Sequence, residues 1–419
     1  MKHLFSSIEM LEPRIAPAAL TAKLAGGVLK IVGDPVAANV TILQTGGSIE
    51  VFDGATSLGA FAGVKSIGAS MTGGGSFNLN LTGSGLPGPC KVTVTGLTAV
   101  NVVTNSHLDG GLSVSGDVAA QTLNVGDNVT IGKGLTFKGG DGVDTFTVGN
   151  GGTIGGNLLL AGVEAGSFNA ASTGTSIAGK LTVLNAGDLL PTNIQTNTSM
   201  KLSIGGGVSV VGGKANDTLF ISATITKSVT FKDTLGDNGL GLGQGSVVHG
   251  SVTMTTGVGG DGFNIQGGTV DGNLTLKLGG GNNTFFYGIA AAVTISGNLS
   301  FTGGSGDDKW QSSGAGMTVG KNVTMKLGDG ANTIAVGVNI SGTKLSVLTG
   351  SGVDTASIEG TGTSVAAIIA LGAGNDLLQG SLLATVKAAS FDGGAGTDHF
   401  AQSTLVADPI VIRSFEDFS

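Results

Sequence analysis

Apolar residues in this chain recur in pairs separated by one residue, and the pairs return about every 22 residues. One such pair is Phe285 and Tyr287, and the equivalent pair one repeat earlier is Phe263 and Ile265. A spacing of two is the period of a β-strand with one face directed inward. Because three such pairs occur in each repeat, the pattern predicts three short strands per repeat.

A glycine-rich phrase, Gly-x-Gly-x-Asp/Asn-x-apolar, marks most repeats. A variant around Asp217 has Ala215 in place of the second glycine. A fixed period between about 20 and 50 residues is typical of a stacked repeat architecture. We call the Asp or Asn of the phrase the anchor, and the full phrase places anchors at Asp144, Asp261, Asn283, Asp308, Asn332, Asp354, Asp376 and Asp398.

Strands this short are not stable alone, so each must pair with the same strand of the next repeat, about 4.8 Å away. The sequence therefore predicts an all-β fold, a parallel β-helix (β-solenoid) of ~22-residue coils with three short strands per coil. Like residues then form files along the axis, with Phe263, Phe285 and Trp310 in one buried file. The corner residues Asn273 and Asn298 are expected to stack and hydrogen-bond with Asn322.

Four regions follow from where the period is strong. Residues 1–19 form a targeting segment, 20–80 a strand-rich N-terminal cap, 81–404 the β-solenoid and 405–419 a C-terminal cap. A cap is expected because the terminal coil of a solenoid exposes an unpaired strand edge. Segments near Gly166, Asp188 and Gly239 have the right spacing without the phrase, and we interpret them as degenerate coils.

Composition and charge limit the function classes. The chain has 419 residues, 78 of them Gly, and its mean hydropathy of +0.35 is too high for a disordered segment. The net charge of −8 argues against nucleic acid as a partner and is compatible with cation binding. No apolar run approaches the ~18–20 residues of a transmembrane span. A single cysteine, Cys90, excludes an internal disulfide.

Three of the turns, GGDGVDTFT (139–147), GGSGDDKWQ (303–311) and GGAGTDHFA (393–401), resemble the GGxGxDxUx repeat of RTX-type calcium-binding β-rolls. The resemblance implies that the Asp side chains and turn carbonyls bind Ca²⁺. The chain departs from that family in having one such turn per coil instead of one every nine residues. The candidate calcium ligands are Asp144, Asp308, Asp354, Asp376 and Asp398.

Physical chemistry leaves two interpretations of the anchors. Carboxylates stacked about 4.8 Å apart, as expected for Asp354, Asp376 and Asp398, repel by roughly 1 kcal/mol or more per pair, and a Ca²⁺ ion would relieve this. A surface calcium site at Asp307, Asp308 or Asp329 is a further version of this interpretation. Alternatively, Asp and Asn simply hydrogen-bond to the backbone of their own turn. The neutral amides Asn283 and Asn332 favour the second interpretation.

The sequence predicts no catalytic residues. Parallel β-helices also include pectin lyases and related enzymes, which group carboxylates with Arg or Lys in one groove. Basic residues here are few and scattered, and His399 lies at an outward position with no second His nearby. We therefore predict that the protein is not an enzyme, and keep a polysaccharide lyase or hydrolase as an alternative.

The N-terminal LEPRIAPAA (11–19) resembles the LEPR-type motif that opens many large secreted bacterial surface proteins with glycine-rich β-repeat bodies. The resemblance implies export to the cell surface or the exterior. The predicted function is a non-enzymatic extracellular or cell-surface structural or adhesive β-solenoid protein, and the first alternative is an RTX-like calcium-binding module. The partners implied are cell-envelope or extracellular-matrix components, or further copies of the chain.

Overall fold

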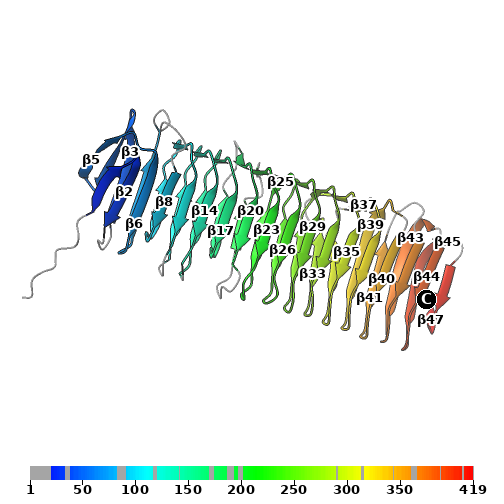
Figure 1. Ribbon diagram of the computed structural model, residues 1–419. Helices are drawn as coiled ribbons and strands as arrows, with labels where there is room; N and C mark the ends of the chain where they lie inside the picture. Colours follow the sequence, from blue (N-terminus) through cyan, green and yellow to red (C-terminus); the bar gives the residue numbers. More distant parts are fainter. Residues whose placement is uncertain are drawn as a thin grey trace, which may run out of the picture.

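The computed structural model shows a rod with the two ends of the chain at opposite ends (Figure 1). The described residues contain 47 β-strands and no helix, so the predicted all-β fold is confirmed. The structure describes residues 20–33, 38–82, 91–116, 120–140, 142–168, 174–185, 193–196, 202–288, 291–312, 316–342, 344–359, 366–386, 388–407 and 410–418.

The N-terminal end of the rod is built from antiparallel strands. β1 (Thr21–Ala25) pairs with β2 (Val28–Gly33), and β3 (Ala38–Thr45) pairs with β4 (Ser48–Asp53). β4 pairs in turn with β5 (Thr56–Ala62). β2 and β3 then continue the parallel pairing of the later coils, so this hairpin region is joined to the solenoid by main-chain hydrogen bonds. The hairpins cover strand edges that the first coil would otherwise expose.

Three parallel sheets run along the rod. The first sheet contains β1, β2, β6 (Ser66–Met71), β8 (Lys91–Thr95), β11 (Leu112–Ser115), β14 (Leu135–Lys138), β17 (Leu158–Ala161), β20 (Leu181–Leu184), β23 (Val208–Val211), β26 (Val229–Lys232), β29 (Val252–Thr255), β32 (Leu274–Lys277), β35 (Leu299–Thr302), β38 (Val323–Lys326), β40 (Lys344–Leu348), β42 (Ala366–Ala370), β44 (Ala388–Asp392) and β46 (Ile410–Arg413).

The second sheet follows each turn that carries an anchor. It contains β3, β4, β5, β7 (Gly75–Asn80), β9 (Ala99–Val102), β12 (Thr122–Val125), β15 (Thr145–Val148), β18 (Ala165–Phe168), β21 (Asn193–Thr196), β24 (Thr218–Ile221), β27 (Gly239–Leu242), β30 (Gly262–Ile265), β33 (Thr284–Tyr287), β36 (Lys309–Ser312), β39 (Thr333–Ile340), β41 (Thr355–Glu359), β43 (Leu377–Val386), β45 (His399–Ala407) and β47 (Asp417–Phe418).

The third sheet has the shortest strands and occupies the middle of the rod. Its members are β10 (His107–Leu108), β13 (Thr130–Ile131), β16 (Thr153–Ile154), β19 (Thr175–Ile177), β22 (Leu202–Ile204), β25 (Ala223–Ile225), β28 (Ser246–Val248), β31 (Gly268–Val270), β34 (Val293–Ile295) and β37 (Met317–Val319). β39 then pairs with both β36 and β37, so the second and third sheets merge there. The later coils have two longer strands, where the apolar pair of the third strand fades from the sequence.

The register confirms the parallel β-solenoid. Leu112, Leu135, Leu158 and Leu181 are successive partners at steps of 23 residues, and the strands lie side by side along the rod (Figure 1). Steps elsewhere range from 21 residues (Val208–Val229) to 27 (Leu181–Val208). The degenerate coils near Gly166 and Gly239 are present as β18 and β27, whereas Asp188 lies outside the described residues. Unequal coils differ in their turns, while strand register is kept.

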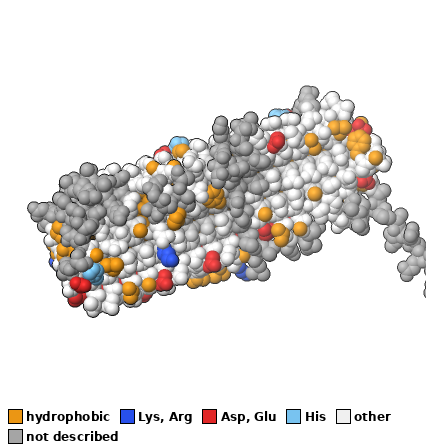
Figure 2. All heavy atoms as spheres, turned by 180° about the vertical axis from the view of Figure 1, so that it is seen from behind, with side chains coloured by type: hydrophobic (Ala, Val, Ile, Leu, Met, Phe, Trp, Pro, Cys, Tyr) orange, Lys and Arg blue, Asp and Glu red, His pale blue; other side chains and the backbone are white. Residues whose placement is uncertain are grey.

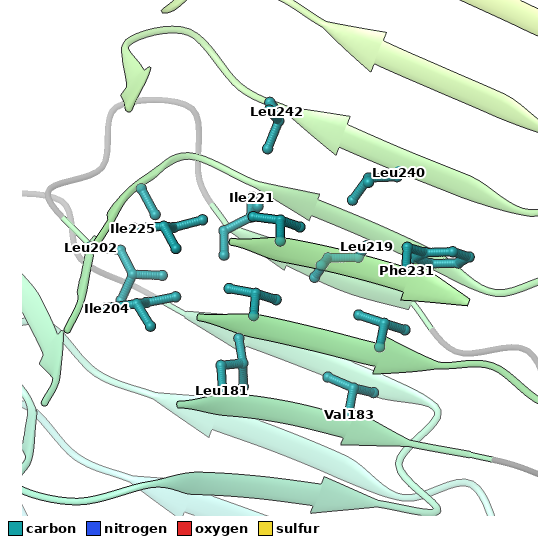
Figure 3. Packing of buried hydrophobic residues seen from close by; sticks show 14 of the residues in the cluster. Leu181, Val183, Leu202, Ile204, Leu219, Ile221, Ile225, Phe231, Leu240 and Leu242 are labelled. Carbon is teal, nitrogen blue, oxygen red and sulfur yellow. The ribbon is translucent and has the colours of Figure 1, made fainter. Parts of the chain in front are cut away.

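The core is a single dry interior enclosed by the three sheets. In Figure 3, Leu181 and Val183 of the first sheet, Leu219 and Ile221 of the second and Ile204 of the third point toward one another. All five side chains are at most 1% exposed. Since each strand contributes alternate residues to this interior, the two-residue period of the sequence is the direct cause of the packing.

The aromatic file lies in the core, as expected. Phe285 lies between Phe263, with ring centroids 5.6 Å apart, and Trp310, with centroids 4.2 Å apart and an edge-to-face geometry. Trp310 and Tyr287 are fully buried. The Tyr287 hydroxyl accepts a hydrogen bond from the Gly337 amide at 3.1 Å. These aromatic rings are therefore packing residues and are not platforms for a ligand.

The corner before the first sheet carries the expected stack of amides. The Asn298 amide N–H donates to Asn273 Oδ1 at 2.8 Å, and the Asn322 amide N–H donates to Asn298 Oδ1 at 3.2 Å. Ser228 and Ser251 extend the stack with their hydroxyl oxygens as acceptors. Each side chain thus satisfies a backbone donor in a neighbouring coil that the bend leaves without a strand partner.

Candidate functional site

The five predicted calcium ligands all lie in one file, at the end of the glycine turn and directly before a strand of the second sheet. None of them faces solvent. Their exposed fractions are 0% for Asp144, Asp308, Asp354 and Asp398 and 2% for Asp376. The candidate site is therefore a buried polar file running parallel to the apolar core, and we call it the anchor ladder.

The anchor ladder is held by one hydrogen bond per coil. The backbone N–H of each anchor donates to the side-chain oxygen of the anchor one coil later. The Asp354 N–H donates to Asp376 Oδ1 at 2.8 Å, and the Asp376 N–H donates to Asp398 Oδ1 at 2.8 Å. The same bond joins Gln121 to Asp144, Asp144 to Glu164, Asp217 to Asn238, Asn238 to Asp261, Asp261 to Asn283, Asn283 to Asp308, Asp308 to Asn332, Asn332 to Asp354, and Asp398 to Glu416.

Acids and amides alternate through the middle of the ladder. Each amide can donate as well as accept, so Asn283 Nδ2 donates to Asp308 Oδ1 at 2.9 Å and Asn332 Nδ2 donates to Asp354 Oδ1 at 2.8 Å. The same Asn332 Nδ2 also donates to carbonyls of its own turn, which agrees with the turn-forming interpretation. The alternation keeps buried carboxylates two coils apart and covers seven consecutive anchors: Asp217, Asn238, Asp261, Asn283, Asp308, Asn332 and Asp354.

The alternation ends near the C-terminal end of the rod, where Asp354, Asp376, Asp398 and Glu416 follow one another. Burial raises the pKa of Asp376 to about 6, and the Asp354 and Asp398 carboxylates raise it further against the hydrogen bond from the Asp354 amide. The Oδ2 atoms of Asp376 and Asp398 are buried without a hydrogen-bond partner. Burial also raises the pKa of Asp308 to about 6.

A second acidic pair lies beside the ladder. Asp233 is 3% exposed, and burial, together with a hydrogen bond to the Asp217 side chain, raises its pKa to about 6. Its Oδ1 accepts the Thr234 amide at 2.6 Å. A buried carboxyl that shares a hydrogen bond with another carboxyl keeps a proton more readily than an exposed one.

Sequence reasoning missed several members of this site: Gln121, Glu164, Asp233, Asn238 and Glu416 lack the glycine phrase. The signal that could have found four of them was position alone, because each lies directly before a strand of the second sheet. For Asp233, which lies five residues before Asn238, the sequence holds no such signal.

The surface acids behave differently from the ladder. Asp307 Oδ1 accepts the Ala331 amide at 2.8 Å, and Asp329 Oδ1 accepts the Ser351 amide and hydroxyl, each at 2.8 Å. Each therefore caps a backbone donor of the next coil. In the part of the chain that the structure describes, no group of three or more His, Cys, Asp or Glu side chains is close enough to hold a metal ion. His399 lies 3.0 Å from Asp417.

The arrangement can bind protons and can fix the register of the coils. Each anchor oxygen accepts a backbone N–H from the next coil only if the two coils are aligned, so a slipped coil would leave buried donors unsatisfied. Fold and site together define a β-solenoid whose coils are locked by a buried carboxyl–amide file. Comparison of the chain with family models, with curated proteins and with solved structures gave no match. None of the described residues forms a helix that could span a membrane.

Proposed function

We propose that this protein is a non-enzymatic extracellular or cell-surface rod that acts as a structural spacer or adhesive body. One observation carries the proposal: the polar residues that define the repeat point inward and bond coil to coil. The repeat is thereby devoted to building length. Main-chain bonds of the sheets run along the rod, so stretching or bending it must break many of them together.

The location rests on the LEPR-type segment at 11–19, which lies outside the described residues. An epitope tag at the C-terminal end would be stained on intact and on permeabilised bacterial cells that express the chain. We expect staining of intact cells, and its loss when residues 1–19 are deleted. A full-length chain stained only after permeabilisation would overturn the surface location.

An adhesive role predicts attachment to cell-envelope or extracellular-matrix material, or to further copies of the chain. Purified rod would be sedimented with isolated envelopes, and its own association state would be measured by analytical ultracentrifugation. The heat-unfolded chain is the control for non-specific retention. A monomeric rod that stays in the supernatant would leave the spacer role and remove the adhesive one.

Calcium binding is a second candidate, favoured by the unpartnered Oδ2 atoms of Asp376 and Asp398. A bound Ca²⁺ would offset the repulsion in this acidic run and stabilise the folded state by mass action. Thermal unfolding would be followed in millimolar Ca²⁺, in Mg²⁺ and in excess chelator. A calcium-specific rise in Tm that disappears in the variant Asp376→Asn, Asp398→Asn supports the site. A Tm that calcium does not move removes it.

The enzymatic alternative is tested with pectin, alginate and similar anionic glycans. We expect no new reducing ends and no unsaturated products. Reproducible cleavage by the purified chain would replace the structural proposal by that of a polysaccharide lyase or hydrolase.

A further inference from the structure

Charge is divided unequally between the sheets of this acidic protein. The strands of the first sheet contain eight lysines and Arg413 against one acid, Asp392. The second and third sheets together contain Lys309 against four acids, Glu50, Asp53, Glu359 and Asp417. The first sheet is therefore cationic although the whole chain has a net charge of −8. The lysines of the first sheet are Lys23, Lys30, Lys91, Lys138, Lys232, Lys277, Lys326 and Lys344.

Three of these lysines form a regular row in the middle of the rod. Register pairs Lys232 with Thr255, Thr255 with Lys277, Lys277 with Thr302 and Thr302 with Lys326. A lysine thus recurs at every second coil, which at the spacing of paired strands is about 10 Å. All three lysines are exposed, and the described ion pairs of the protein all join His to Asp. Their charges are therefore available to a partner.

A stripe of hydroxyl groups runs beside the row. The residue two positions before each member of the row also points outward, and it is Ser or Thr in seven consecutive coils. These hydroxyls donate and accept hydrogen bonds. The stripe consists of Thr182, Ser209, Thr230, Thr253, Thr275, Ser300 and Thr324.

We propose that this face, over β26 to β38, binds an extended acidic polysaccharide that lies along the rod. The proposal deepens the adhesive role and in that sense rests on it, because it names the class of partner. The lysine row would pair with carboxylate or sulfate groups, and the hydroxyl stripe would hydrogen-bond to the sugars. A pyranose advances a glycan by about the spacing of one coil, so a chain charged at every second sugar matches the lysine period.

The chemistry of the face favours a glycan over a nucleic acid. Outward positions of the first sheet hold no aromatic residue in the described strands, and single-stranded nucleic acids bind largely by stacking on aromatic rings. Duplex DNA carries a charge about every 1.7 Å, far denser than one lysine per two coils. The face of the rod seen from behind in Figure 2 is mostly uncharged, with isolated acidic and basic side chains.

The test compares two triple variants of the full chain with equal net charge. The row variant is Lys232→Gln, Lys277→Gln, Lys326→Gln. The control variant is Lys65→Gln, Lys214→Gln, Lys309→Gln, which removes three exposed lysines that lie outside the first sheet. Circular dichroism and Tm verify that both variants fold. The probes are hyaluronan, which has one carboxylate per disaccharide, neutral dextran, and single-stranded DNA.

We expect the parent to bind hyaluronan in a salt-sensitive manner and not to bind dextran. The row variant should bind about tenfold more weakly, since three exposed ion pairs are lost, and the control variant should bind like the parent. Equal losses in both variants, no binding by the parent, or tighter binding of DNA than of hyaluronan would each overturn the proposal. The spacer and surface-location tests do not use this face, so their outcome is independent of it.

Discussion

Buried carboxyl groups are usually paired with a cation or kept neutral, because an isolated charge in the protein interior is strongly unfavourable. The anchor ladder uses the second solution for most of its length. An amide between two acids supplies an N–H donor that a second carboxylate could not supply. In the run from Asp354 to Glu416 no amide intervenes, and the raised pKa of Asp376 follows from that arrangement.

Stability is therefore expected to fall as the pH rises from about 4 to about 7. The pKa values of Asp233, Asp308 and Asp376 are about 6 in the folded protein against 3.8 ordinarily, so between these values the folded state holds more protons than the unfolded state. We expect Tm to be a few degrees higher at pH 4.5 than at pH 7.5. The pKa of exposed Asp329 is lowered, which acts in the opposite direction. Melts at four pH values test this, and a Tm that rises with pH would contradict it.

Asp376→Asn should stabilise the rod at pH 7.5 and leave it unchanged at pH 4.5. The amide keeps the acceptor for the Asp354 N–H and removes the charge. Leu371 lies five residues before Asp376, as Leu278 and Leu327 lie before the natural amide anchors. The reverse change, Asn332→Asp, places three acids in a row and should lower Tm at pH 7.5. Equal effects of either change at both pH values would show that charge is not the cause.

At the scale of the element, each turn is fixed by glycine and each strand by its inward pair. The second glycine of the phrase adopts a positive φ in most coils, for example +126° at Gly330 and +138° at Gly352. This region of backbone space is open essentially to glycine alone. The turn also passes close to its neighbour, because a Cβ on Gly330 would lie 2.3 Å from the Gly306 carbonyl oxygen.

Gly330→Ala is therefore expected to destabilise the rod by about 1–3 kcal/mol. Gly262→Ala is the matched control, because Gly262 has no positive φ and nothing within 4 Å of its would-be Cβ. Chemical denaturation of the two variants makes the comparison. If Gly330→Ala is as stable as the control, the turn conformation described here is wrong.

Phe285→Asp should unfold the coils around it, because it places an unpaired charge among four aromatic rings. The milder Phe285→Ala should cost about 3–5 kcal/mol. Phe286→Asp is the control, since residue 286 faces outward beside Asn264 and Gln311. Limited proteolysis and circular dichroism would report the difference. Two aspartate variants of equal stability would mean that the inward face has been misassigned.

At the scale of the whole molecule, stability is a sum over coils and their neighbours, and length is adjustable. The N-terminal hairpins close one end, and the sheets run uninterrupted to β46 and β47 at the other. The charge difference between the first sheet and the rest is also a property of this scale, since it arises only when equivalent positions of distant coils are brought into line.

Excision of residues 252–298 should give a shorter rod that still folds. This segment is two complete coils, because Val252, Leu274 and Leu299 are successive register partners. Asn238 would then precede Asp308, so the alternation of amide and acid is kept. Small-angle scattering should show a rod shorter by about 10 Å. Excision of 252–262, which is half a coil, should prevent folding of the adjacent coils. Similar folding of both deletions would contradict the register.

The sequence by itself determined the solenoid, the inward files and the corner amides, because a repeat writes each of these contacts once per coil in the same positions. The run Phe263, Phe285 and Trp310 was readable because strand period and coil period agree at those residues. Only the tertiary structure decided which way the anchors point. An Asp in a glycine turn is compatible with solvent, with calcium or with the interior, and the choice depends on the neighbouring coil's unpaired N–H. Coils without the phrase, such as that of Asn238, could join the ladder only through packing. The lysine row likewise became visible when register placed residues 45 to 49 positions apart next but one to each other.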